Sequence, residues 1–211
     1  MSVSDIRKSY DKGALNEAEL NPDPIKQFRI WLDEALETNI LEPTAVALAT
    51  ASAVGRPSLR MVLLKGVRDE GLVFYSNYES RKGKELAANP QAAMTVYWDA
   101  LERQVRVEGS TKKLPRGDSR DYFKSRPRGS QIGALASPQS QVISGREVLE
   151  KKVEDLSGAY GEGEVPLPEN WGGYLLRPDL VEFWQGRPSR LHDRLRYKLI
   201  EDSWAVERLA P

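Results

Sequence analysis

The only histidine of the chain, His192, lies in its densest group of chemically useful side chains. Trp184 precedes it, and Arg190 and Arg194 stand on either side of it. An aromatic ring, two guanidinium groups and an imidazole suit a flat, anionic, heteroaromatic ligand. The residue types leave one alternative open, a salt-bridged hairpin end in which Asp193 pairs with an arginine. A Ser-His-Asp hydrolase is disfavoured because the chain has no G-x-S-x-G motif.

Segment 80–84, Ser-Arg-Lys-Gly-Lys, is a group of cations that could bind phosphate at the start of a predicted helix. Cations in a first helical turn face the positive end of the helix dipole. An anion bound between them and the backbone amides would remove that conflict. A solvated basic surface is the alternative.

Segment 125–131, Ser-Arg-Pro-Arg-Gly-Ser-Gln, is a second such group. Its two guanidinium groups, two hydroxyls and glycine suit a phosphate monoester, which arginine can bind through two hydrogen bonds. A plain surface loop is the alternative. A nucleic-acid-binding loop is disfavoured because the chain has no net charge and no aromatics interleaved with Lys and Arg.

Arg60 and Lys65 stand at the two ends of an apolar run. Strict alternation in a strand sends them to opposite faces, so they can share one ligand only through a bulge or a bend. Otherwise they are the solvated ends of a buried strand.

Composition bounds the remaining function classes. The 211 residues carry 31 Lys and Arg against 31 Asp and Glu, so an anion site must be a local cluster. Without cysteine there is no disulfide, thiolate metal site or cysteine nucleophile, and one histidine excludes a His-rich metal site. Rossmann and Walker motifs are absent. With no apolar run near the roughly 18 residues of a membrane span and no signal peptide, we expect a cytoplasmic protein without metal, membrane or nucleic-acid partners.

The elements that must position these side chains are mostly short strands. Asp23 and Pro24 supply an N-cap and a first helical residue, and helical apolar spacing from Ile25 to Leu36 predicts a helix there. Alternating segments bounded by turn residues predict strands over 45–53, 58–67, 72–77, 92–98, 103–112, 173–176, 180–185, 195–200 and 204–209. Further helices are predicted over 80–88, 118–125 and 144–156, the last with a capping box formed by Ser144 and Glu147.

This order of elements has no repeating βαβ pattern. It predicts a mainly β (α+β) fold, an antiparallel barrel with flanking helices. Residues 1–20 are polar and are expected to be mobile unless they dock, and residues 21–211 are expected to form a single domain.

Nine short motifs follow one another along the chain: Arg60-Met61-Val62-Leu63-Leu64-Lys65, Phe74-Tyr75-Ser76-Asn77, Ser80-Arg81-Lys82, Arg103-Gln104-Val105, Ser125-Arg126-Pro127-Arg128 through Gly133, Gln139-Ser140, Trp171-Gly172-Gly173, Glu182-Phe183-Trp184-Gln185-Gly186 and Arg190-Leu191-His192-Asp193-Arg194. Each motif is weak by itself, and their order over one chain is specific. With them the chain resembles the pyridoxine (pyridoxamine) 5′-phosphate oxidase family over essentially its whole length.

The resemblance implies an FMN-binding split β-barrel homodimer with two sites, each built from both subunits. It assigns the phosphate and ribityl end of FMN to Arg60, Ser76, Arg81 and Lys82. The isoalloxazine ring or its polar edge would contact Lys65, Gln104, Gln139, Ser140, Trp184 and Arg194, and the cofactor set also includes Met61, Val62, Leu63, Leu64 and Tyr75.

The resemblance also implies a substrate site. Lys65, Tyr122, Arg126 and Ser130 would bind the substrate phosphate, and Arg190, Leu191 and His192 would lie at its ring. Arg190 and His192 would be the catalytic residues near the reacting carbon. Arg7 and Tyr10 would belong to the mobile segment, residues 1–20, that closes over the site.

The implied reaction is FMN-dependent oxidation of pyridoxine 5′-phosphate or pyridoxamine 5′-phosphate to pyridoxal 5′-phosphate. Hydride would pass from C4′ to flavin N5, and O2 would reoxidise the flavin and form H2O2. Two alternatives use the same barrel: a non-catalytic protein that binds flavin or pyridoxal phosphate, and a related reductase that uses a deazaflavin or haem.

Overall fold

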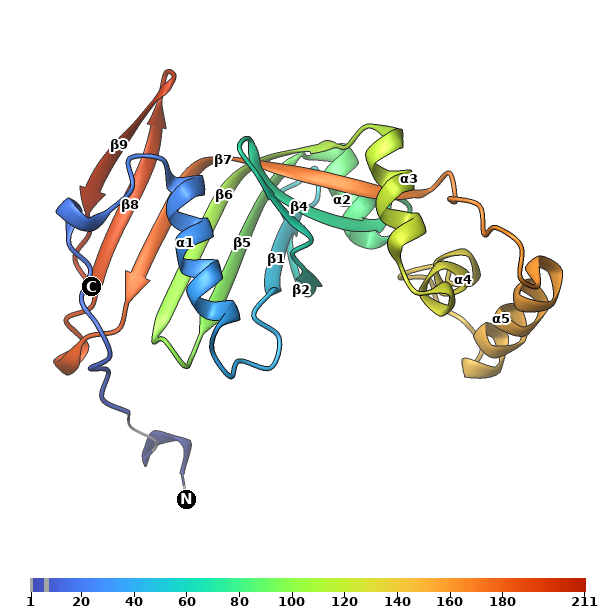
Figure 1. Cartoon of the computed structure of the whole chain (residues 1–211), viewed down its shortest axis with the longest axis horizontal. Coiled ribbons are helices and arrows are strands. Elements are labelled where there is room, and N and C mark those ends of the chain that lie inside the picture. The colour runs from blue at the N-terminus through green and yellow to red at the C-terminus, as the bar shows by residue number, and fades with distance from the viewer. Residues whose placement is uncertain (1, 6–7) are drawn as a thin grey trace.

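The computed structural model describes residues 2–5 and 8–211 and folds them into a long, strongly curled antiparallel sheet flanked by helices (Figure 1). Within those residues the sheet has nine strands: β1 (Ala45–Ala51), β2 (Pro57–Leu63), β3 (Gly66–Arg68), β4 (Gly71–Asn77), β5 (Gln91–Trp98), β6 (Arg103–Lys113), β7 (Trp171–Gln185), β8 (Asp193–Ile200) and β9 (Ser203–Arg208). The helices are α1 (Pro24–Leu36), α2 (Arg81–Ala88), α3 (Arg116–Ser125), α4 (Arg128–Ala136) and α5 (Arg146–Tyr160), with 3-10 turns at Val3–Asp5, Glu17–Glu19 and Pro188–Arg190. The predicted mainly β, antiparallel, barrel-like fold is confirmed.

The strand order β2-β1-β5-β6-β7-β4-β3 places β2 and β3 at opposite ends of the sheet, although they are consecutive in the chain. The short link between them therefore closes the curl. It bonds to both sides, since Leu64 N donates to Thr44 O at 2.8 Å and Lys65 N donates to Val73 O at 2.8 Å. The single strand predicted over 58–67 is wrong, because the chain bends at this link between Arg60 and Lys65.

The longest strand, β7, spans the molecule. It pairs with β6 along most of its length, with β4 through its first residues and with β8 through its last. The sequence predicted two strands here, with a break near Pro178. The structure has one, because Pro178 lies at the register shift between Glu108 and Gly109, and a bulge tolerates a residue without an N–H.

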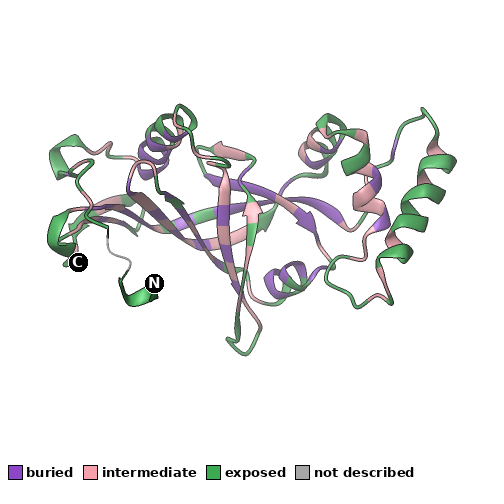
Figure 2. Ribbon diagram, turned by 90° about the horizontal axis from the view of Figure 1, so that it is seen from below, coloured by how far each residue is buried: buried purple, intermediate pink, exposed green. Residues whose placement is uncertain are grey.

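The main core lies between α1 and the sheet. As predicted, Asp23 caps α1, and its side chain accepts a hydrogen bond from Ile25 N at 2.8 Å. Trp31 of α1 stands edge-on to Phe183 of β7, with ring centroids 5.0 Å apart. Full burial of an apolar side chain contributes roughly 1.5–3 kcal/mol, so the apolar face of α1 fixes this helix on the sheet. Buried residues concentrate in the strands, whereas α5 has none among its residues (Figure 2).

Two helix predictions need correction. Residues 128–136, of which the first part was expected to be a loop, form α4, which packs Ile132 beside Phe123 and Trp171 in a second core. Glycines and the missing side-chain cap hid this helix, which tertiary packing stabilises. The predicted capping box is also wrong: Gly145 is the N-cap of α5, and no side chain caps that helix.

The part of segment 1–20 that is described beyond residue 7 docks on the end of the sheet. Leu15 is 4% exposed and donates its backbone N–H to Asp193 Oδ2 at 3.1 Å. Closure of this segment over a site stays a prediction, and Arg7 lies outside the described residues. None of the helices in the described chain is long and apolar enough to cross a membrane.

Candidate active site

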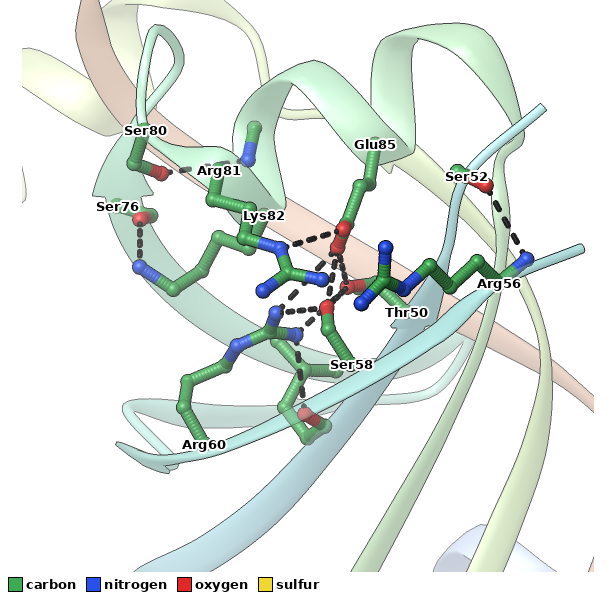
Figure 3. A network of polar contacts seen from close by, with 12 residues as sticks. Thr50, Ser52, Arg56, Ser58, Arg60, Ser76, Ser80, Arg81, Lys82 and Glu85 are labelled. Carbon is green, nitrogen blue, oxygen red and sulfur yellow. Dashed lines mark hydrogen bonds and ion pairs between the residues drawn. The ribbon is translucent and has the colours of Figure 1, made fainter. Parts of the chain in front are cut away.

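Two arginines and one carboxylate meet where β1, β2 and the start of α2 come together (Figure 3). Glu85 accepts a hydrogen bond from Arg81 Nε at 2.9 Å, and its Oε2 lies 3.3 Å from Arg60 Nη2. Thr50 and Ser58 donate their hydroxyls to the same carboxylate. Burial raises the pKa of Glu85, but these hydrogen bonds outweigh it and lower the pKa to about 2. The carboxylate is therefore a fixed negative charge that orients both arginines.

Lys82 is buried beside this pair and has no carboxylate partner among the described residues. Its Nζ donates to Ser76 Oγ at 3.1 Å and to Gln139 Oε1 at 2.9 Å, and both acceptors are neutral. Burial, and then the positive charge of Arg60, lower the pKa of Lys82.

With Arg60, Arg81 and Lys82 against Glu85, the cluster holds three cations and one carboxylate. Two positive charges remain uncompensated at the start of a helix. A phosphate monoester carries roughly two negative charges near neutral pH, so the local charge suits such a group. The predicted conflict between first-turn cations and the helix dipole is present, and a bound anion would relieve it.

A stack of aromatic rings lies beside Arg126 of segment 125–131. Tyr75 of β4 stacks on Tyr122 of α3 at 3.8 Å between centroids and on Trp171 of β7 at 5.5 Å. The guanidinium of Arg126 lies 4.8 Å from the centroid of Trp171. Burial lowers the pKa of Arg126, and its buried Nη1 has no hydrogen-bond partner in the part of the chain that the structure describes. A buried cationic N–H without an acceptor is costly, which makes this a place for an anionic ligand.

Arg126 lines a cavity of about 250 Å³ together with Ser130 and Gln139. Since Gln139 also bonds to Lys82, the cavity borders the cation cluster. Arg128 turns away from it and donates to Gly163 O at 2.8 Å. The expectation that both guanidinium groups of segment 125–131 serve one ligand is therefore wrong, because only Arg126 faces the cavity.

A larger open cavity, of about 760 Å³, lies beside the C-terminal end of β7. The rings of Trp184 and His192 are 4.7 Å apart, and Tyr10 stands edge-on to them at 5.7 and 5.6 Å. The structure thus brings Trp184, Arg190 and His192 of the group singled out in the sequence to one cavity, whereas Arg194 does not line it. The ion pair that the alternative reading predicted for this hairpin end is also present, since Asp193 pairs with Arg208 at 2.7 Å.

His192 is held as a neutral imidazole. The backbone N–H of Arg187 donates to its Nδ1 at 3.1 Å, and burial, then the charge of Arg190, lower its pKa. A neutral imidazole that accepts at Nδ1 carries its proton on Nε2, which leaves Nε2 as a donor. Ser189 and Arg190, at φ 58° and 63°, both have left-handed backbone. Such strain costs about 1–3 kcal/mol per residue and collects at functional sites.

The other expected site residues are placed as follows. Gln104 of β6 and Arg194 of β8 lie opposite Trp184 on either side of it. Arg194 forms a two-pronged ion pair with buried Glu182, at 2.9 and 3.1 Å, and this pair raises its pKa. Lys65, Ser140, Met61, Leu63 and Leu191 are exposed, Val62 is half-buried and Leu64 is buried. Their assigned roles stay predictions.

One strand keeps the two cavities apart. Trp171, beside Arg126, begins β7, and Trp184, beside His192, lies near its end. At about 3.3 Å per residue this separation is roughly 40 Å. Figure 1 shows the same separation, with α3 and α4 at one end of the sheet and β8 and β9 at the other. Within one chain, Arg126 and His192 do not meet.

Thr50, Ser58 and Glu85 form hydrogen bonds in the cation cluster and were not predicted from the sequence as site residues. A signal existed for each: Glu85 follows Arg81 at the i,i+4 spacing of a helical ion pair, and Thr50 and Ser58 are cross-strand neighbours of the β1–β2 hairpin. In the described residues, no group of three or more His, Asp or Glu could hold a metal ion.

Comparisons with known proteins identify the family to which the chain belongs. Residues 32–159 match the family model described as pyridoxamine 5′-phosphate oxidase, and residues 171–211 match the pyridoxine 5′-phosphate oxidase C-terminal dimerisation region. The chain is 54% identical over 211 residues to a pyridoxine/pyridoxamine 5′-phosphate oxidase of Cyanothece sp., covering 100% of this chain and 99% of the relative. It is 52% identical to the protein of that name from Salinibacter ruber, with 99% of both chains covered.

Among solved structures, PhzG from Burkholderia lata 383, in complex with tetrahydrophenazine-1-carboxylic acid, superposes with a TM-score of 0.90. It is 30% identical, with 97% of this chain and 100% of that chain covered. A pyridoxamine 5′-phosphate oxidase-related, FMN binding protein from Nostoc punctiforme superposes with a TM-score of 0.70 at 18% identity, covers 92% of this chain and 100% of that chain, and shares the fold. The chain belongs to the pyridoxamine 5′-phosphate oxidase family.

Proposed function

We propose that this protein is an FMN-dependent oxidase that converts pyridoxine 5′-phosphate or pyridoxamine 5′-phosphate to pyridoxal 5′-phosphate. The observation that carries the proposal is the presence of two neighbouring cationic sites, each with a positively charged side chain that has no carboxylate partner in the described chain. Lys82 supplies the first and Arg126 the second. Two phosphate monoesters, one on the cofactor and one on the substrate, account for both sites. The relatives' names supply the reaction class.

The residues around Lys82 fit the phosphate of FMN. Arg60 and Arg81 are held by Glu85, and Lys82 is held by Ser76 and Gln139, so their orientation precedes binding. A preorganised cluster loses little conformational freedom when the ligand arrives. When bound, FMN supplies a ring that accepts hydride from the substrate C4′ and returns two electrons to O2, with H2O2 as the product.

The residues around Arg126 fit the phosphate of the substrate. Arg126, whose Nη1 has no hydrogen-bond partner in the described chain, and Ser130 line one cavity, and an arginine can donate two parallel hydrogen bonds to a phosphate. Tyr122 of α3 stacks on Trp171, which lines the same cavity. Fixing the phosphate makes reaction at the far end of the substrate effectively unimolecular.

At that far end we assign Arg190 and His192 to the pyridine ring. The Nε2 proton of His192 can be donated to an oxygen or nitrogen of the substrate. Its Nδ1 is occupied by the Arg187 N–H, so His192 orients the substrate as a donor and does not act as the base. Arg190 supplies a positive charge beside it.

In this proposal the residues that bind the two ends of the substrate must come from different subunits, because Arg126 and His192 are roughly 40 Å apart along the length of β7. A homodimer resolves the difficulty. On the edge strand β2, Leu59 and Met61 point outward and are 68% and 63% exposed. The match of residues 171–211 to a dimerisation region supports the same assembly.

The experiment that tests the function is direct. The protein is purified, its absorption spectrum is recorded, and pyridoxine 5′-phosphate is added in the presence of O2. We expect a yellow protein with an FMN spectrum that forms the aldehyde and H2O2 in equal amounts. A protein with bound FMN that forms neither product is instead the non-catalytic binding protein, and a protein that purifies without FMN and does not bind it contradicts the proposal altogether.

A further inference from the structure

Glu102 occupies an unfavourable place for a glutamate. It lies in the tight turn between β5 and β6 with a φ of 54°, a left-handed conformation that glycine adopts freely and glutamate does not. Its side chain is 1% exposed. A charged side chain that is both buried and attached to strained backbone needs contacts that compensate for both costs.

Every polar contact of the Glu102 carboxylate in the described chain comes from one place, residues 8–12 of the N-terminal segment. Oε2 accepts the backbone N–H groups of Asp11 at 2.9 Å and Lys12 at 3.1 Å. Oε1 lies 3.4 Å from Lys8 Nζ. Burial raises the pKa of Glu102, but these three donors outweigh it and hold the pKa below its ordinary value. The carboxylate is thus an anion whose partners all belong to a segment about ninety residues away in sequence.

The anchored residues flank Tyr10, which lines the larger cavity. Tyr10 stands edge-on to Trp184 and His192. Gly186 lies directly against Tyr10, since a Cβ on Gly186 would lie 2.8 Å from the Cβ of Tyr10. Small displacements of residues 9–11 would therefore move the Tyr10 ring relative to both partners.

Residues after 12 have anchors of their own. Arg187 Nη1 donates to Gly13 O at 3.0 Å, and Leu15 N donates to Asp193 Oδ2 at 3.1 Å. These contacts hold the chain from residue 13 onward whether or not Glu102 is present. The influence of Glu102 is thus confined to the residues that carry Tyr10.

We propose that Glu102 is a positioning residue for the larger cavity: its carboxylate anchors residues 8–12 through two backbone N–H groups and Lys8, and so sets Tyr10 against Trp184 and His192. The anchoring itself is independent of any reaction. The effect on substrate rests on the proposed function, and the experiment separates the two.

The chain offers a matched control. Glu201 has almost the same backbone, with a φ of 55° in the β8–β9 turn, but it is exposed and its side chain forms no hydrogen bond or ion pair within the described chain. Glu102→Gly and Glu201→Gly both relieve left-handed strain and remove a carboxylate. Only the first removes the anchor. Glu102→Gln keeps a carbonyl oxygen that can accept from the two amides and lacks the charge, so it tests rescue by a conservative change.

The primary measurement is hydrogen exchange of the Asp11 and Lys12 amides in the dimer as purified, with tryptic cleavage after Lys12 as a second readout. Losing a hydrogen-bond acceptor that is charged should accelerate both in Glu102→Gly by about tenfold or more. Glu201→Gly should match the wild type, and Glu102→Gln should fall between them. Exchange at Val105 and Val107 of β6 reports any general loss of stability and should stay unchanged.

The second measurement is steady-state oxidation of pyridoxine 5′-phosphate. We expect Glu102→Gly to raise KM by about tenfold, with FMN content unchanged and kcat within about a factor of two. Equal exchange at Asp11 and Lys12 in the two glycine variants would overturn the proposal, as would unchanged KM in an active enzyme whose segment has been released. A wild type without oxidase activity would refute the proposed function, and the exchange comparison would then decide the anchoring by itself.

Discussion

At the scale of single residues, the candidate site is defined by charges that lack partners. Arg60 and Arg81 share one carboxylate, Lys82 has only neutral acceptors, and Arg126 has a buried nitrogen with no acceptor in the described chain. Stable folds avoid such arrangements unless a ligand completes them. Replacing Lys82 and replacing Arg126 therefore test separately which ligand each side chain binds.

Replacing Lys82 should weaken FMN and spare the substrate. In Lys82→Met the buried ammonium is lost from a site that otherwise receives a phosphate, and removing one partner of a desolvated charge pair costs roughly 2–5 kcal/mol. We expect the FMN dissociation constant, measured by titration of flavin fluorescence, to rise by about 30-fold or more. Lys84→Met, an exposed lysine on the same helix, is the control and should bind FMN normally. An unchanged constant in Lys82→Met would show that the FMN phosphate lies elsewhere.

Replacing Arg126 should do the reverse. Arg126→Ala should keep tight FMN binding, raise KM for pyridoxine 5′-phosphate by about 30-fold or more, and shrink the preference for phosphorylated over unphosphorylated pyridoxine. The ratio between the two substrates excludes general unfolding, which would damage both alike. Arg128→Ala, whose guanidinium bonds to backbone carbonyls of residues 161 and 163, should keep the wild-type ratio. If Arg126→Ala weakens FMN more than substrate, the division of the two phosphate sites is wrong.

At the scale of elements, α2 is pressed against the turn that precedes it. Ser80 caps the helix by accepting from Gly83 N at 3.2 Å, and a Cβ on Gly83 would lie 2.2 Å from Tyr78 O. This close approach brings the start of the helix, with Lys82, up to Ser76 at the end of β4. The glycine is thus required by packing, although glycine in a helix is intrinsically unfavourable.

Two glycine substitutions test this packing. Gly83→Ala must displace a backbone carbonyl, and we expect it to lower the free energy of unfolding by about 1–3 kcal/mol, as overpacked substitutions do. Gly158→Ala, in α5 with open space around the new Cβ, should raise it by roughly 0.5–1 kcal/mol. Urea denaturation measures both. Stabilisation by Gly83→Ala would mean that α2 stands farther from residues 77–78 than in this structure.

The sequence predicted those elements whose signals are local. The Asp23-Pro24 start of α1, the start of α2 near Ser80 and the alternation in β5 and β6 each depend on a few consecutive residues. The sequence did not predict the elements that depend on contacts between residues far apart in the chain. Pro178 reads as a break until β6 supplies a bulge opposite it, and α4 contains glycines that only packing on Phe123 and Trp171 stabilises.

The candidate site divides in the same way. The motif residues were found because the sequence resembles a known family, whereas the partners of those residues were missed. Glu85 meets Arg60 only because α2 packs beside β1 and β2, and Glu102 meets Lys8 only because the N-terminal segment crosses the sheet end. No spacing in the sequence encodes a contact between residues that are ninety positions apart.

At the scale of the whole molecule, the long sheet separates what the proposed reaction must bring together. Arg126 binds one end of the substrate in our proposal and His192 the other, yet β7 holds them roughly 40 Å apart. Outward-facing Leu59, Met61 and Leu63 of β2 are 68%, 63% and 41% exposed, and a second subunit would cover apolar side chains that a lone chain leaves in water.

Mixed dimers test this architecture without any structure of the dimer. With pyridoxine 5′-phosphate kept well below the wild-type KM, Arg126→Ala and His192→Asn should each lose most of the activity when assayed alone. In a dimer with one subunit of each kind, one site receives both substitutions and the other site receives neither, because each site takes Arg126 from one chain and His192 from the other. Unfolding and refolding an equal mixture makes half the dimers mixed, so activity should return to about a quarter of the wild-type value. Refolding each variant separately is the control and should restore nothing. If the mixture stays as inactive as its components, each site takes both residues from the same chain, and the separation along β7 must then be overcome by a rearrangement within one subunit.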